Sequence, residues 1–329
     1  MMPHLSRRRL LKLGGTSLAT ASIWAPALAL GATPLLTLEG RAFGARWLVT
    51  LPAGANTAGL RPAIETLLAD IDQKMSPWRP DSEITAFNRA PAGSQTVSPE
   101  TGLVAQAALD AANLSDGWFN PAVGPLVAQW GFGPIEGTTG RAAPWAHLAA
   151  APDALSKTEI GLTFDLCGIA KGYALDRMAT TIADFGHEHF LIDLGGELKA
   201  QGHHPEGRIW QVAIEDPRQG FEAPAGALQL DGLAVATSGQ RAQSYQVGPT
   251  IYSHIIDPQN GMPVQSTTAS VSVLASDGMS ADAWATALAA AGVHGPALAE
   301  QAGIAALFLV RQPAGLSRIT TAGFGDYLL

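Results

Sequence analysis

Three segments of the chain carry residue types whose spacing suggests chemistry on an anionic ligand. The first, Asp165–Asp176, reads as a strand, a glycine turn and the start of a helix, with Lys171 in the first helical turn. The helix dipole disfavours a cation there, whereas the free N–H groups of a helix start attract phosphates. Lys171 therefore predicts a bound anion, and the alternative is a lysine that only faces solvent.

The second segment places Asp282 and Thr286 four residues apart, on one face of a predicted helix. Both side chains offer oxygen, the ligand type that Mg²⁺ and Ca²⁺ prefer. The alternative is ordinary helix chemistry, in which Ser280 caps the helix, an acid occupies the first turn and Thr286 bonds a carbonyl of its own helix.

The third segment is a strand that carries His254 and runs into a turn over residues 257–261. A histidine at an exposed strand end can accept a proton from an attacking hydroxyl, or it can simply bond the turn. Glycine turns at 193–197 and 236–239 would let backbone approach a ligand closely. Aromatic residues within 75–88 and 117–133 could stack on a planar ring or belong to the core.

Composition excludes several classes of protein. The 329 residues are 47% hydrophobic and 15% charged, which rules out a disordered chain. The net charge of -8 argues against a nucleic-acid partner, and a single cysteine rules out an internal disulfide framework or a thiolate-rich metal site. The chain also lacks a phosphate-binding P-loop, a G-x-G-x-x-G fingerprint, a G-x-S-x-G elbow and an H-E-x-x-H motif.

Hydrophobic periodicity predicts the elements that must position these residues. Five helices are expected, at 58–75, 99–115, 169–184, 280–291 and 295–302. Eight strands are expected, at 46–51, 162–166, 189–194, 210–214, 233–236, 252–256, 269–275 and 305–310. Because the strands run in groups without regular helix alternation, we expect an α+β fold, with residues 31–329 forming one mixed domain of two intimately joined lobes.

The first thirty residues are interpreted as an export signal. Arg7, Arg8 and Arg9 precede a mildly apolar stretch that ends in the small-residue cleavage pattern Ala27-Leu28-Ala29. The alternative is a short membrane anchor, which would tether the protein if the segment were not cleaved. We therefore expect a periplasmic protein exported by the twin-arginine route.

Six motifs in order along the chain resemble the ApbE family of FAD:protein FMN transferases. The resemblance extends from about residue 40 to Leu288. The motifs are M-S-x-[YW]-x-P-D-S-E-[IL] at 75–84, F-[DN]-P-x-V-G-P-L-V at 119–127, D-L-x-G-I-A-K-G-Y-A-x-D at 165–176, A-T-S-G at 236–239, Y-S-H-I-I-D-P at 252–258 and A-D-A-x-A-T-A-L at 281–288.

The resemblance implies a mixed α/β domain that binds FAD with Mg²⁺ or another divalent cation. It also implies transfer of FMN, through a phosphoester, to a Ser or Thr of an acceptor flavoprotein, with release of AMP. Carried over by position, His254 is the expected general base. The metal ligands are the Gly168 carbonyl, Asp282 and Thr286. The expected FAD contacts are Phe43, Trp78, Trp118, Phe119, Asn120, Asp165, Lys171 and Ile256.

The chain departs from the family pattern at three positions. Phe43 stands where members commonly have Met, Asn120 replaces a frequent Asp, and Cys167 replaces a frequent Gly. None of these changes removes an expected metal ligand or the base. Two other functions remain as alternatives: an FAD pyrophosphatase that gives FMN and AMP, and a non-catalytic flavin carrier or maturation factor for an exported redox complex.

Overall fold

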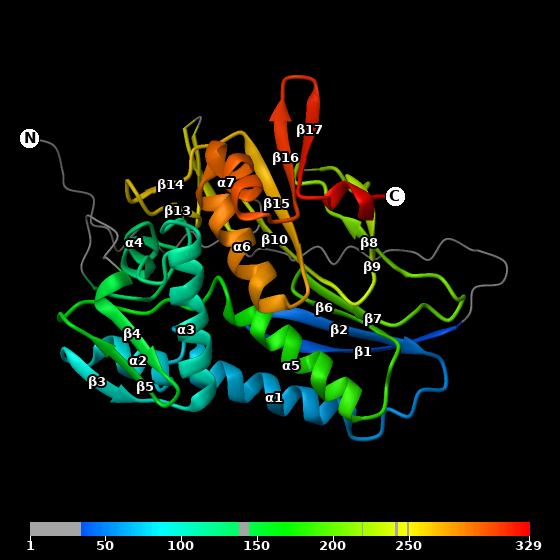
Figure 1. Cartoon of the computed structure of the whole chain (residues 1–329), viewed down its shortest axis with the longest axis horizontal. Coiled ribbons are helices and arrows are strands. Elements are labelled where there is room, and N and C mark those ends of the chain that lie inside the picture. Colours follow the sequence, from blue (N-terminus) through cyan, green and yellow to red (C-terminus); the bar gives the residue numbers. More distant parts are fainter. Residues whose placement is uncertain (1–33, 138–144, 219, 241–242, 249) are drawn as a thin grey trace, which may run out of the picture. The chain divides into compact units, whose positions relative to one another are not determined.

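An eight-stranded sheet forms the centre of the structure, a computed structural model that describes residues 34–137, 145–218, 220–240, 243–248 and 250–329 (Figure 1). The strand order is β1-β2-β6-β7-β10-β15-β16-β17, and every neighbouring pair is antiparallel. The bounds are β1 Leu35–Ala42, β2 Ala45–Pro52, β6 Phe190–Leu194, β7 Glu197–Gln201, β10 Ala234–Gly239, β15 Thr268–Ala275, β16 Ala306–Gln312 and β17 Gly315–Thr321. This sheet confirms the α+β class expected from the sequence.

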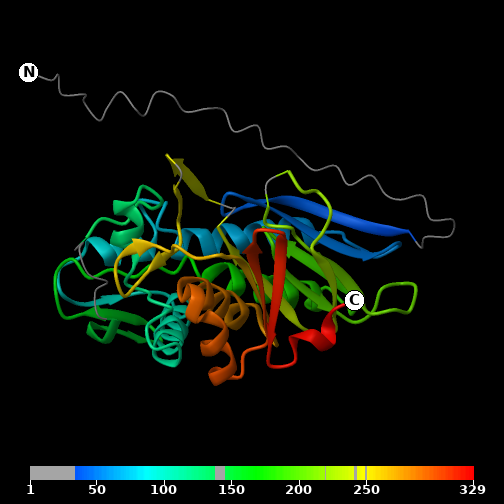
Figure 2. The same ribbon diagram turned by 90° about the horizontal axis from the view of Figure 1, so that it is seen from above.

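Helices cover one face of the sheet, as Figure 1 shows for α1, α5 and α6. They are α1 Leu60–Met75, α5 Ala170–Asp184 and α6 Gly278–Ala290, with α7 Gly295–Ala302 packed beside α6 (Figures 1 and 2). Strand residues alternate between two apolar clusters: in β16, Ala306 and Phe308 pack with the helices, whereas Leu307 and Leu309 pack on the opposite face. There they meet β8 Trp210–Ile214, β9 Gly226–Leu230 and η4 Phe324–Tyr327.

A smaller sheet, of order β3-β5-β4, lies against α3. Its strands are β3 Gly93–Thr96, β4 Leu148–Ala151 and β5 Ala154–Lys157, and α3 spans Pro99–Leu114. The remaining elements are α2 Glu83–Arg89, α4 Gly124–Gln129, η2 Trp145–His147, β11 Ser244–Val247, β12 Thr250–Ser253, β13 Ile256–Asp257, β14 Met262–Pro263 and η3 Gly292–His294. Of these elements, α4 and β13 contribute residues to the cavity described below: Gly124 and Val127 from α4, and Ile256 from β13.

The five helices expected from the sequence are confirmed, but one cap differs. The N-cap of α6 is Asp277, whose Oδ1 accepts from the backbone N–H of Ser280 at 2.7 Å. The expected cap, Ser280, therefore lies inside the first turn. Asp277 captures a free N–H group of the helix start, which ends the extended chain three residues earlier than expected.

The strand expected at 162–166 is wrong, because no strand among the described residues pairs with this segment. Instead, the side-chain amide of Asn88 forms two hydrogen bonds with the backbone of Phe164. Its Oδ1 accepts from Phe164 N at 2.7 Å, and its Nδ2 donates to Phe164 O at 2.9 Å. Asp165 N donates to Pro121 O at 2.7 Å. The segment is thus held as irregular extended chain by two other parts of the fold.

The strand expected at 252–256 is interrupted at His254. Strand β12 ends at Ser253, and β13 begins at Ile256. The backbone N–H and the ring Nδ1 of His254 both donate to the carbonyl of Gln243, and the next residue, Ile255, belongs to neither strand. His254 therefore lies between two short hairpins, β11–β12 and β13–β14.

Helices α5 and α6 cross at two glycines. A Cβ atom at Gly172 would lie 2.1 Å from the carbonyl oxygen of Gly278, so only glycine fits. The close approach brings the first turn of α5 beside Asp282 on α6.

The expected export signal, residues 1–30, lies outside the described residues. Within the described part of the chain, no helix is both long and apolar enough to cross a membrane.

Candidate active site

A cavity of about 790 Å³ opens beside the starts of α5 and α6. Its wall includes all twelve residues that the sequence predicted for the site: Phe43, Trp78, Trp118, Phe119, Asn120, Asp165, Gly168, Lys171, His254, Ile256, Asp282 and Thr286. The fold thus gathers residues from distant parts of the chain in one place.

The three expected metal ligands lie together at the α5–α6 contact. Thr286 Oγ1 lies 3.5 Å from the carbonyl oxygen of Gly168, in the turn that precedes α5. A Cβ atom at Gly168 would approach Thr286 Oγ1 to 2.9 Å, so a glycine keeps this space open. Asp282 Oδ2 accepts from the backbone N–H of Gly172 at 3.0 Å, which commits only one of its two carboxylate oxygens.

Lys171 is the ammonium group at the centre of an acidic cluster. It forms an ion pair with Glu197, which is 3% exposed at the start of β7. The other carboxylate oxygen of Glu197, Oε2, is buried and has no hydrogen-bond partner among the described residues. Glu197 as a residue also lines the cavity.

Burial governs the protonation of these groups. Burial opposes the charged form of Lys171, but the carboxylates of Glu197 and Asp282 outweigh it and raise the pKa of the ammonium. Burial raises the pKa of Glu197 to about 7, against the attraction of Lys171. Burial also raises the pKa of Asp165 and of Asp282. The cluster therefore carries more carboxylates than cations and favours a cationic ligand.

One ring nitrogen of His254 is held by the backbone and the other is free. Its Nδ1 donates to the carbonyl of Gln243 at 3.2 Å, which leaves Nε2 as the nitrogen free to accept a proton. Burial lowers the pKa of His254, and the positive charge of Lys171 lowers it further, against the opposing effect of the Gln243 carbonyl. The imidazole is thus neutral at neutral pH, which is the form that can take a proton.

Aromatic side chains line the outer part of the cavity. Trp78 is 64% exposed, while Phe119 is buried. Trp118 stacks on the ring of His294, with centroids 6.1 Å apart. Phe43 occupies the β1–β2 turn with a positive φ of 52°, followed by Gly44 at 75°, the pattern of a tight hairpin turn. These rings offer surfaces on which a planar group can stack.

Sequence reasoning missed Glu197 as a site residue. The segment 193–197 drew notice only as a glycine turn, because nothing local to it indicates a lysine partner. The sequence feature that could have indicated Glu197 is an acidic residue directly after two glycines. Gly195 and Gly196 have φ values of 67° and 106°, which form the turn that precedes Glu197.

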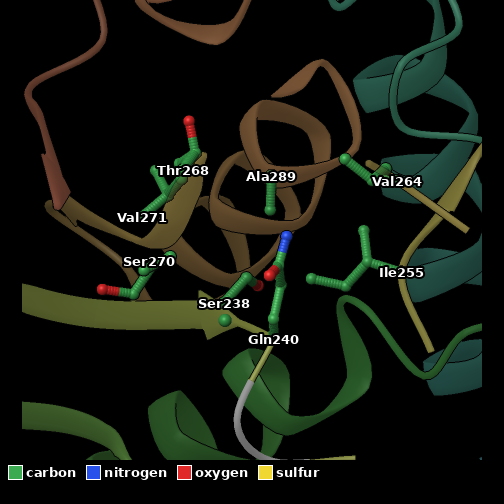
Figure 3. Close-up of a pocket in the computed structure, with 10 residues that line it drawn as sticks. Ser238, Gln240, Ile255, Val264, Thr268, Ser270, Val271 and Ala289 are labelled. Atoms are coloured by element: carbon green, nitrogen blue, oxygen red, sulfur yellow. The ribbon is translucent and has the colours of Figure 1, made fainter. Parts of the chain in front are cut away.

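A small second space adjoins the cavity behind Ser238 and Ile255, which line both. Figure 3 shows Gln240 and Ala289 facing it as well. Its volume of about 10 Å³ has room for one water molecule and no organic ligand.

Comparison with known proteins agrees with this geometry. The ApbE family model matches residues 43–308. The chain belongs to the ApbE family. It is 33% identical to the FAD:protein FMN transferase of Vibrio cholerae over 290 residues, covering 84% of this chain and 87% of the relative. The Escherichia coli K12 protein of the same name is 32% identical over 283 residues, covering 78% of each chain.

Solved structures of ApbE proteins share the fold. The flavin transferase ApbE from Vibrio cholerae superposes with a TM-score of 0.79 at 31% identity, covering 90% of this chain and 100% of the other. The apo flavinyl transferase ApbE of Pseudomonas stutzeri gives 0.79 at 32% identity, covering 89% and 96%. The mixed fold is therefore that of the ApbE family.

Proposed function

We propose that this chain is an FAD:protein FMN transferase that joins the FMN part of FAD to a Ser or Thr hydroxyl of an acceptor protein and releases AMP. The observation that carries the proposal is the convergence of a neutral histidine, a lysine and an oxygen-rich ligand set on one cavity. The name of the relatives from Vibrio cholerae and Escherichia coli supports the same reaction.

The residues present fit a divalent cation. A carboxylate, a hydroxyl and a backbone carbonyl form a hard-oxygen donor set, at Asp282, Thr286 and Gly168. The buried Oε2 of Glu197 lacks a partner, and the carboxylates around Lys171 would repel a diphosphate without added positive charge. When bound, Mg²⁺ would supply the charge that offsets the diphosphate of FAD.

The reaction follows from what the side chains can do. The acceptor hydroxyl oxygen forms a bond to the phosphorus of the FMN half, and the bond from that phosphorus to the bridging oxygen breaks. The AMP half leaves with the bridging oxygen. His254 Nε2 takes the hydroxyl proton, and Lys171 stabilises negative charge at the diphosphate. Trp78, Trp118 and Phe43 provide stacking surfaces for the rings of FAD.

An assay with purified components tests the proposal. The chain is incubated with FAD, Mg²⁺ and an acceptor domain that the Vibrio cholerae transferase modifies, and that transferase serves as positive control. We expect fluorescent flavin that stays on the acceptor after denaturation, in equal amount to the AMP released. Free FMN with AMP would indicate a pyrophosphatase, and stably bound FAD without AMP would indicate a carrier; either outcome contradicts the proposal.

Two variants assign the roles within the site. His254→Ala should lower transfer about 100-fold or more, because the proton acceptor is lost. Asp282→Asn keeps the acceptor of the Gly172 N–H but removes a negative metal ligand, so transfer should no longer respond to added Mg²⁺. His147→Ala, at an exposed histidine, is the matched control. Wild-type transfer by either site variant would contradict its assignment.

We also propose that residues 1–30 direct export by the twin-arginine route and that the enzyme acts in the periplasm. The consecutive arginines 7–9 and the small-residue pattern 27–29 support this assignment.

A further inference from the structure

Asp176 ends the motif that carries Lys171, yet it lies outside the cavity wall. It is on α5, four residues after Gly172 and therefore on the same face of that helix. Its carboxylate reaches the start of α6: Oδ1 accepts from Gly278 N at 2.8 Å, and Oδ2 accepts from Met279 N at 3.1 Å. Figure 1 shows the start of α6, in orange, beside the first half of α5, in green.

These two bonds cap α6 from a neighbouring helix. The first N–H groups of a helix have no acceptor within it and need one from outside. The local cap, Asp277, accepts from Ser280 N. Asp176 accepts from the two N–H groups that precede Ser280, so the start of α6 is fixed by α5 as well as by its own cap.

Lys199 holds the Asp176 carboxylate in place. Its Nζ donates to Asp176 Oδ1 at 2.6 Å and to the carbonyl of Ser276 at 3.3 Å. The side chains of Lys199 and Asp176 are 16% and 23% exposed, so water screens this pair less than it screens a surface ion pair. Lys199 lies on β7, two residues after Glu197, which binds Lys171 of α5. Two ion pairs of opposite polarity therefore join α5 to β7.

The capped start of α6 determines where two of the expected metal ligands lie. Asp282 and Thr286 follow Gly278 at intervals of four residues, so all three share one face of α6. One turn along each helix from the contact between Asp176 and Gly278, Gly172 N donates to Asp282 Oδ2 at 3.0 Å. Hydrogen bonds at two successive turns keep α6 from sliding or rotating against α5.

We propose that Asp176 is a positioning residue for the metal site. By capping α6 it sets the register of that helix against α5, and so it holds Asp282 and Thr286 beside the Gly168 carbonyl. Lys199 orients the carboxylate for this role. The inference rests on the proposed function for its cation and for FAD, and it adds a residue outside the cavity on which the affinity for the cation depends.

Titration calorimetry of Mg²⁺ into the FAD-loaded protein, without acceptor, tests the role of Asp176. Asp176→Ala removes both acceptors of the α6 N–H groups, so the Kd for Mg²⁺ should rise about tenfold or more. Asp176→Asn keeps one oxygen acceptor and should give a Kd between those of wild type and the alanine variant. With acceptor present, kcat at saturating Mg²⁺ should fall much less than the Mg²⁺ affinity, because Asp176 touches no reacting group.

Two controls separate positioning from a general loss of stability. Asp184→Ala removes an exposed acid at the end of the same helix. Ser98→Ala removes the N-cap of α3, a helix with no residue among those that line the cavity, and it should lower the melting temperature. Both control variants should keep the wild-type Kd for Mg²⁺.

A wild-type Kd for Mg²⁺ in Asp176→Ala would overturn the positioning role, and so would an equal rise of the Kd in Ser98→Ala. If the alanine variant does not fold, a wild-type Kd in Asp176→Asn would overturn the role instead. A wild-type protein that binds Mg²⁺ and FAD but forms no covalent FMN on the acceptor would overturn the proposed function and leave the role of Asp176 intact.

Discussion

Glu197 shows how one buried carboxylate shapes the site at the scale of a residue. It holds Lys171 with one oxygen and leaves the other without a partner in the described structure. A buried carboxylate in this position is costly unless a cation approaches it. Glu197 therefore fixes the position of Lys171, and its negative charge favours a cationic ligand in the cavity.

A prediction about pH follows for Glu197→Gln. Burial raises the pKa of Glu197 from 4.5 to about 7. Between those values the native protein holds a proton that the unfolded chain has lost. The free energy of unfolding therefore falls as pH rises through this window, by about 1.4 kcal/mol per pH unit from this group. Glutamine does not titrate, so the variant should lack this contribution.

Urea denaturation between pH 4.5 and 7, without added metal, measures the difference. The slope of unfolding free energy against pH should be more positive for Glu197→Gln than for wild type. Glu188→Gln, at a surface glutamate, is the matched control and should keep the wild-type slope. Identical slopes for wild type and Glu197→Gln would show that burial does not raise this pKa.

At the scale of elements, the crossing of α5 and α6 sets the geometry of the site. Gly172→Ala should destabilise the fold by about 1–3 kcal/mol, because the new Cβ would lie 2.1 Å from the Gly278 carbonyl oxygen and must separate the helices. The separation should also weaken Mg²⁺ binding, since Asp282 bonds Gly172 N. Chemical denaturation and metal titration measure the two effects.

Gly325→Ala is the control for this crossing, because its nearest neighbour to an added Cβ is 3.8 Å away. Equal stability of both alanine variants would mean that the helices can part without cost.

The irregular segment before α5 is held by two hydrogen bonds from the side chain of Asn88, which we call the Asn88 clamp. Asn88→Ala should remove both hydrogen bonds to Phe164 and leave its backbone groups unpaired, at a cost of about 1–3 kcal/mol. Because Gly168 lies four residues further on, the affinity for Mg²⁺ should fall as well. Thermal melting and a metal titration follow the change. Asn56→Ala, at an exposed asparagine, should alter neither; a wild-type melting temperature for Asn88→Ala would refute the clamp.

At the scale of the whole molecule, the proposed export by the twin-arginine route can be tested at the N-terminal segment. Replacing Arg7, Arg8 and Arg9 together by lysine should leave a full-length precursor in the cytoplasm, because the twin-arginine signal is lost while its charge is kept. Cell fractionation with immunoblotting measures this, and Lys12→Arg is the control. A processed periplasmic product from the triple variant would contradict the proposed route.

Much of the molecule was predictable from local patterns. Apolar residues at helical spacing gave the five helices, and six ordered motifs indicated the residues that line the cavity. The prediction of a strand at 162–166 was wrong although its composition is typical of a strand. The backbone of this segment bonds Asn88 and Pro121, and no local sequence pattern reveals such distant partners. Glu197 was missed for a related reason, since its lysine partner lies 26 residues away.

The sequence by itself indicated which residues line the cavity, through six ordered motifs that resemble the ApbE family, and the class of fold, through hydrophobic spacing along the chain. Only the tertiary structure decided the strand order, the interruption at His254 and the pairing of Lys171 with Glu197. The bond from Gly172 N to Asp282 joins residues 110 apart. Contacts at that separation depend on how the helices pack on the sheet, and packing is a property of the whole fold.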